Sequence, residues 1–244
     1  MSNDSATPGP QKGFRDPVGL TRWVRGLLCA YVALNLVWIW MHARAYQELV
    51  GGGTVLPLPL RVGLPFVGLI GLILIFVWVY RAHHNAEQLG ATGLKFSPGW
   101  SVGCYFVPVV WFWKPYQAMK EVWQASASPS GWTRQPGSVL LKCWWMCWLL
   151  AFFAEQAVSL AVGTSGVMPD PGAVEVGADL ATNAVEVPLT LLLLVIIGRV
   201  NRMQMEQYRK QVAAGRIRVR EGGGTMRSGS RAAPTADLTL SPPR

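Results

Sequence analysis

Four apolar stretches limit what this chain can fold into, because each is close to the length of about 20 residues that a helix needs to cross about 30 Å of bilayer hydrocarbon. They cover residues 26–41, 62–80, 143–162 and 183–198. Only 14% of the 244 residues are charged, whereas a typical soluble domain carries about 25%. We therefore expect an all-α integral membrane protein with four transmembrane helices.

A fifth apolar stretch covers residues 100–113. As a helix it would be about 21 Å long, which is short for a full crossing. It also contains Gly103 and Pro108, which interrupt regular helices. We expect a re-entrant or interfacial aromatic segment within residues 97–126.

The distribution of basic residues gives an independent argument for this topology. Of the 22 Lys and Arg residues, four precede residue 26, six lie at 81–142 and ten lie from residue 199 onward. Only two lie at 43–61, and none at 163–182. With four spans, the three basic groups share one side, as the positive-inside rule requires of the cytoplasm. We expect a multipass membrane protein with both termini in the cytoplasm.

The residues after Trp113 predict an amphipathic helix on the inner membrane surface. Pro115 suits a first helical turn, and the apolar side chains recur at helical spacing: Tyr116, Met119, Val122 and Trp123. The polar residues point elsewhere: Lys114, Gln117, Lys120, Glu121 and Gln124. Upstream, Ser97 followed by Pro98 is a helix-start signal.

Composition divides the chain into three parts. Residues 1–19 are predicted to be a disordered cytoplasmic segment, and no signal peptide is expected to be cleaved there. Residues 20–208 form the membrane domain. Residues 209–244 are a basic, mostly disordered cytoplasmic tail. The basic helix that leads into this tail either attracts anionic lipid or docks an acidic partner.

The spacing of several motifs resembles a known family. Tyr80-Arg81, Asn85 and Leu89-Gly90 precede Phe96-Ser97-Pro98-Gly99-Trp100. After the apolar stretch come Trp113-Lys114-Pro115-Tyr116-Gln117-Ala118-Met119, Glu121, Trp123, Ala125-Ser126 and the pair Trp144-Trp145. This pattern, over roughly Leu20 to Tyr208, is similar to the bacterial membrane family catalogued as domain of unknown function 4328. The resemblance implies a multipass protein of the bacterial cytoplasmic membrane and no particular activity. Family members often carry an Asn shortly before the second motif, where this chain has Trp111 and Phe112.

Two carboxylates lie inside predicted spans. Glu155 is 13 residues past Lys142, and Glu186 is 13 residues before Arg199, so both lie about 20 Å from the inner boundary. Carboxylates at matching depth on adjacent antiparallel helices can meet and share a proton. Arg61 and His42 lie at the outer ends of their spans and could neutralise the pair, and Asn35 could add a hydrogen bond. The pair is a proton or cation relay, part of a polar ligand pocket that opens outward, or a polar contact that holds two helices together.

No catalytic motif is present, and no cofactor is implied. Cys143 and Cys147 are four residues apart, as are His83 and Glu87, but nothing in the sequence joins these pairs, so we expect no metal site. The four cysteines lie in apolar stretches, where a disulfide framework is not expected. The formal charge of +9 has no accompanying nucleic-acid motif, so basic flanks of membrane spans explain it and no nucleic-acid partner is expected.

The leading hypothesis is a non-enzymatic module that binds lipid or protein at the cytoplasmic membrane face. Its expected partners are the bilayer, anionic lipids, and a membrane-protein partner or a second copy of the chain. The candidate binding residues are Ser97, Pro98, Gly99, Trp100, Trp113, Lys114, Pro115, Tyr116 and Gln117. The alternative is a small proton-coupled transporter or channel that uses Glu155 and Glu186, with Asn35 and Arg61 nearby.

Overall fold

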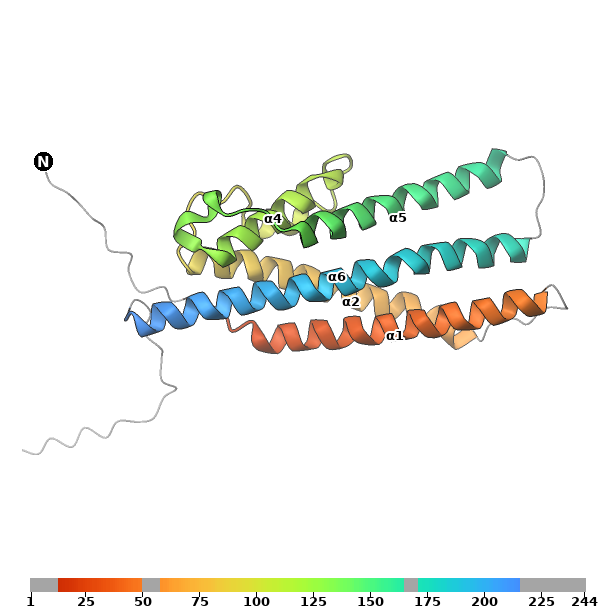
Figure 1. Cartoon of the computed structure of the whole chain (residues 1–244), viewed down its shortest axis with the longest axis horizontal. Helices are drawn as coiled ribbons and strands as arrows, with labels where there is room; N and C mark the ends of the chain where they lie inside the picture. The colour runs from red at the N-terminus through yellow and green to blue at the C-terminus, as the bar shows by residue number, and fades with distance from the viewer. Residues whose placement is uncertain (1–12, 50–57, 165–170, 216–244) are drawn as a thin grey trace, which may run out of the picture.

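The described parts of the chain form a bundle of long helices. The computed structural model describes residues 13–49, 58–164 and 171–215. The long helices are α1 (Val18–Leu49), α2 (Leu58–Gln88), α5 (Val139–Thr164) and α6 (Pro171–Ala213). They run side by side, and both ends of the described chain lie at the same end of the bundle as α4 (Lys114–Ala127) (Figure 1). We call this end the hairpin end.

Each long helix contains a segment long and apolar enough to cross a membrane. These segments are Val18–Met41, Pro65–Gln88, Val139–Ala157 and Ala184–Ala213. They overlap all four predicted spans, which confirms an all-helical fold with four candidate membrane helices. Many of their large apolar side chains are exposed on the bundle surface, as lipid-facing side chains are: Leu36, Val37, Phe66, Ile70, Ile73, Leu150 and Phe153 are examples.

The helices are longer than the apolar stretches that predicted them. Helix α6 has 43 residues, or about 65 Å, roughly twice the hydrocarbon thickness. Its second half continues past Arg199 and packs against α2 and α4. The polar continuation therefore forms a helix because other protein segments cover one of its sides.

Residues 98–127 form a helical hairpin that turns back instead of crossing. Helix α3 (Pro98–Gly103) leads into the 3-10 turn η1 (Val110–Phe112), and the chain returns as α4. A further 3-10 segment, η2 (Pro129–Arg134), leads to α5. The turn follows from the sequence, because Gly103 and Pro108 interrupt the stretch and Pro115 begins the returning helix.

Helix α4 is packed into the bundle. Its apolar residues Met119 and Val122 are buried in the main core together with residues of α1, α2, α5 and α6. The predicted amphipathic helix is present, and its apolar side is covered by protein. The prediction that Glu121 and Gln124 point away from the core was wrong, because both are buried and hydrogen-bonded. Amphipathic periodicity identifies the apolar side of a helix, but it does not tell whether lipid or protein covers that side.

The main core lies toward the hairpin end. Its buried residues are Val24, Leu28, Trp78, Val79, Ala82, Met119, Val122, Leu141, Trp144, Trp145, Leu193, Ile196, Ile197 and Val200. The core is thus built where α4 joins the four long helices. Toward the other end, α1 and α2 approach closely because Gly68 has no side chain, and a Cβ there would lie 3.3 Å from the ring of Tyr31.

Candidate functional site

A buried carboxylate joins the two motifs of the candidate site. Glu121 of α4 accepts hydrogen bonds from the backbone N–H groups of Lys95, at 2.9 Å, and Phe96, at 3.0 Å. These residues lie immediately before Ser97 and α3. Burial raises the pKa of Glu121 above its usual range, and the two N–H donors act in the opposite direction. The contact fixes where the first arm of the hairpin begins relative to the second.

Ser97 begins α3 as the motif predicts. Its side chain accepts a hydrogen bond from the backbone N–H of Trp100, and Pro98 occupies the first helical turn. Ser101 is buried and donates its hydroxyl to the carbonyl of Pro98. The Ser-Pro-Gly-Trp motif is therefore largely a helix start, and it leaves Trp100 exposed.

Lys114 lies where the two arms of the hairpin meet. Its ammonium group is 5.7 Å from the centre of the Phe96 ring, within the range of a cation–π contact. The adjacent Trp113 is exposed, as is Gln117 one turn further on. Of the candidate binding residues, Ser97, Gly99, Trp100, Trp113 and Gln117 are exposed, Pro98, Lys114 and Tyr116 are half-buried, and Pro115 is buried.

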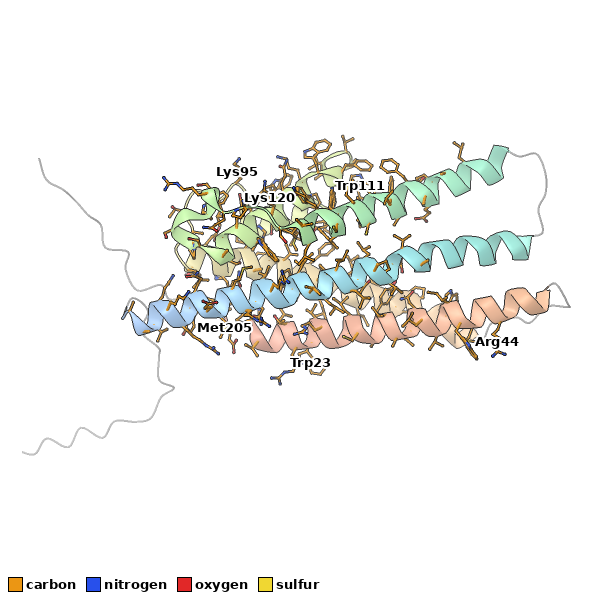
Figure 2. The ribbon with its side chains drawn as sticks, in the orientation of Figure 1. Trp23, Arg44, Lys95, Trp111, Lys120 and Met205 are labelled. Atoms are coloured by element: carbon orange, nitrogen blue, oxygen red, sulfur yellow. The ribbon has the colours of Figure 1, made fainter. Side chains whose placement is uncertain are left out.

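Aromatic side chains wedge the turn of the hairpin between α2 and α5. On one side, Phe76 of α2 contacts Tyr105 at 5.2 Å and Phe106 at 5.3 Å between ring centres. On the other side, Trp111 lies edge-on to Trp148 at 5.3 Å and contacts a second ring of α5 as well. Figure 2 shows Trp111 beside α5. These ring contacts hold the turn of the hairpin against α2 and α5.

Trp111 and Phe112 pack against one ring of α5. Trp111 contacts the ring of Phe152 at 5.1 Å, and Phe112 contacts the same ring at 5.4 Å. Phe152 lies about 20 Å along α5 from Val139. Trp111 and Phe112 are therefore packing residues in this chain, as edge-on aromatic pairs commonly are.

The tip of the hairpin is strained. Val109 has φ 68° and ψ −47°, and the N–H of Val110 donates to the carbonyl of Pro108 at 2.7 Å. This is the geometry of a γ-turn of the rarer, strained kind. A β-branched residue at positive φ costs roughly 1–2 kcal/mol. Val109 is exposed, as is Phe106, so the tip is also apolar.

A row of glutamines on α6 caps the C-terminal ends of two other helices. Gln207 donates to the carbonyl of Ala127, the last residue of α4, at 2.7 Å, and Gln211 donates to the carbonyl of Leu89, just past α2, at 2.7 Å. Gln204 is buried and donates to Ala82 of α2 at 2.8 Å. The bonds from Gln207 and Gln211 satisfy carbonyl groups that a helix end leaves without partners, whereas Ala82 lies inside α2.

Within the bundle, one of the two predicted carboxylates has a partner. The hydroxyl of Tyr31 on α1 donates to a carboxylate oxygen of Glu186 on α6 at 2.7 Å. One turn along α1, Asn35 is buried and its amide donates to the backbone carbonyl of Tyr31 at 2.9 Å. Glu186 therefore links two helices through a residue that the sequence analysis did not single out.

The structure does not bring the two carboxylates together. Glu155 is exposed on α5, and the described chain shows no hydrogen bond between it and Glu186. Arg61 lies in the first turn of α2, and its side chain falls outside the described part, as does that of His42. The geometry gives no support to a shared-proton site.

The residues considered for a metal site are also separate. Among the described residues, no three His, Cys, Asp or Glu side chains are grouped closely enough to hold a metal ion. His83 is buried, with Nδ1 3.2 Å from the carbonyl of Val79, and Cys143 is exposed. All four cysteines are free.

Sequence reasoning missed three features that organise the hairpin end. They are the carboxylate of Glu121, the glutamine row of α6, and Asn85, whose amide binds the backbone of the segment before α1. Glu121 and Asn85 belong to the family pattern, which was the available signal. No sequence signal marked the glutamines, because they match the polar side of a basic helix.

Four candidate membrane helices and a packed hairpin that does not cross define a multipass membrane protein. The chain belongs to the family described as domain of unknown function (DUF4328), which matches residues 60–202. The matched region begins in α2, includes the whole hairpin and ends in α6. Comparison with curated proteins and with solved structures gives no match.

Proposed function

We propose that this chain is a non-enzymatic membrane module that binds anionic lipid at its hairpin end. One observation carries the proposal: exposed basic side chains from α1, α5, α6 and η2 gather at this end without acidic partners. They are Arg22, Arg25, Arg134, Lys142, Arg199, Arg202 and Arg209. Within the described residues none of the seven forms an ion pair, whereas Lys210 binds Glu206.

The bases of α1 and α6 adjoin one another. A Cβ on Gly198 would lie 3.9 Å from the guanidinium of Arg25, so this arginine lies against the start of the basic part of α6. Arg199 follows directly and is exposed. Charges from two helices at one level suit the phosphate of a lipid headgroup, and each base near an anionic surface contributes about 1 kcal/mol.

Exposed tryptophans at the same end favour a lipid partner. Trp23 of α1 is 76% exposed, and Trp100 and Trp113 of the hairpin are also exposed (Figure 2 labels Trp23). Tryptophan is enriched where a membrane meets water, because its ring is apolar and its N–H is polar. The base Lys114 directly follows the exposed Trp113 in the sequence, so a basic and an aromatic side chain are neighbours at this end.

The same charge distribution supports a cytoplasmic hairpin end in a bacterial cytoplasmic membrane. A fluorescent protein that matures only in the cytoplasm, fused after residue 244, tests this orientation. We expect a fluorescent fusion. If only a fusion within the 163–182 segment is fluorescent, the protein has the opposite orientation in the membrane.

Native mass spectrometry of the full chain in mild detergent tests the lipid proposal. The probes are phosphatidylglycerol, which is anionic, and phosphatidylcholine, which is not. We expect preferential retention of phosphatidylglycerol, and less of it in an Arg25→Gln/Arg199→Gln variant and in Lys114→Gln. Arg44→Gln is the matched control, because Arg44 is an exposed base at the opposite end (Figure 2). Equal retention of both lipids, or an equal loss in the control, would contradict the proposal.

A further inference from the structure

The segment before α1 is held as a bound peptide would be. The amide of Asn85 makes two hydrogen bonds to the backbone of Arg15: Oδ1 accepts from its N–H at 3.1 Å, and Nδ2 donates to its carbonyl at 2.9 Å. Nε2 of His84 lies 3.0 Å from the carbonyl of Gly13. These are contacts to main-chain groups that any residue would offer.

One contact of this segment is specific to its sequence. The ring of Phe14 stacks on Tyr208 of α6, with ring centres 4.3 Å apart and planes 13° apart. Gly13 lies against the far end of the flexible Gln88 side chain, which could move aside for a larger residue. The side chain of Arg15 is exposed. The contacts therefore select an aromatic residue at the position of Phe14, and they leave the next side chain free.

The receiving groups come from elements that are already fixed. His84, Asn85 and Gln88 lie in the last turns of α2, and Gln211 of α6 binds the carbonyl of Leu89 just beyond them. Asn85 is fully buried, and both of its polar atoms are used on the segment. A buried amide without partners costs about 1–3 kcal/mol, so this site requires a peptide backbone when closed.

We propose that the last turns of α2 and Tyr208 of α6 form a peptide-binding site, and that the chain's own residues 13–15 occupy it as a releasable latch. The site takes a non-helical peptide with an aromatic residue at the position of Phe14. The proposal does not depend on the proposed lipid binding. It also gives Asn85, a residue of the family pattern, a binding role. The expectation that residues 1–19 are disordered is wrong for residues 13–17, which are docked; residues 1–12 lie outside the described part.

Competition between the latch and an added peptide tests the proposal. The probe is a fluorescently labelled peptide, Gln-Lys-Gly-Phe-Arg-Asp-Pro-Val, which copies residues 11–18. The receptor is the full chain in detergent, either unchanged or with Phe14→Ala, which weakens the latch and leaves the site intact. We expect the peptide to bind the Phe14→Ala chain at least about tenfold more tightly, because the intact latch competes at high effective concentration.

Matched controls use the same binding measurement. A peptide with alanine in place of phenylalanine should not bind, and Tyr208→Ala in the Phe14→Ala chain should abolish binding of the unchanged peptide. Hydrogen exchange gives a second readout that needs no added peptide: the N–H of Arg15 should exchange faster in Phe14→Ala than in the unchanged chain. Equal binding to both chains, no binding to either, or equal exchange would overturn the proposal.

Discussion

The carboxylate of Glu121 accepts a hydrogen bond from the backbone N–H of Phe96, across 25 residues of sequence that contain the whole turn of the hairpin. With the neighbouring bond from Lys95, it ties the start of the first arm to the middle of the second. This contact gives a structural reason for a glutamate in the second motif.

Replacing Glu121 with alanine should destabilise the fold. Two backbone N–H donors lose their acceptor, and a buried donor without a partner costs about 1–3 kcal/mol. Thermal unfolding in detergent measures the loss. Glu206→Ala is the control, because Glu206 is exposed and pairs only with Lys210 one turn away. Equal unfolding temperatures for the two variants would show that the contact does not hold the hairpin.

Replacing Val109 with glycine should stabilise the protein. Glycine adopts positive φ without the steric cost that valine has there, so we expect a gain of up to about 1–2 kcal/mol, reduced by the greater freedom of glycine in the unfolded chain. Val107→Gly is the control, since Val107 has no positive φ and should only lose stability. Chemical unfolding measures the free energy of unfolding of both variants. A loss of stability in Val109→Gly would contradict the inference that Val109 is strained.

Removing the glutamine contacts of α6 should loosen the ends of the helices they close. Gln207→Ala and Gln211→Ala should each cost about 0.5–1.5 kcal/mol, the net value of a hydrogen bond. Hydrogen exchange should rise at the end of α4 for the first variant and at the end of α2 for the second. Arg209→Ala, an exposed change between them, should leave both ends protected. A uniform rise along the chain would point to global loosening instead.

Tyr31→Phe should weaken the contact between α1 and α6. Hydrogen bonds between membrane helices contribute about 0.6 kcal/mol on average and at most about 1.7 kcal/mol, so the change in unfolding free energy should be small. Tyr80→Phe is the control, because within the described chain the hydroxyl of Tyr80 makes no hydrogen bond. A loss well above 2 kcal/mol would mean that Glu186 depends on Tyr31 for more than one hydrogen bond.

Features that depend on local composition could be predicted from the sequence. Apolar stretches long enough for a bilayer predicted four helices, and the shortness and interruptions of residues 100–113 predicted a segment that does not cross. These signals are readable because the cost of placing each side chain in hydrocarbon depends chiefly on that side chain and its depth.

Which groups bind one another could not be predicted from the sequence and follows from the packing of the folded chain. Asn85 meets Arg15 across 70 residues, and Gln211 meets Leu89 across 122, so no local pattern places these partners together. The same reason explains why Glu186 binds Tyr31 while Glu155 stays exposed: matching depth brings two helical residues to one level, but rotation about each helix axis decides whether they face each other. That rotation is fixed by packing of the whole bundle.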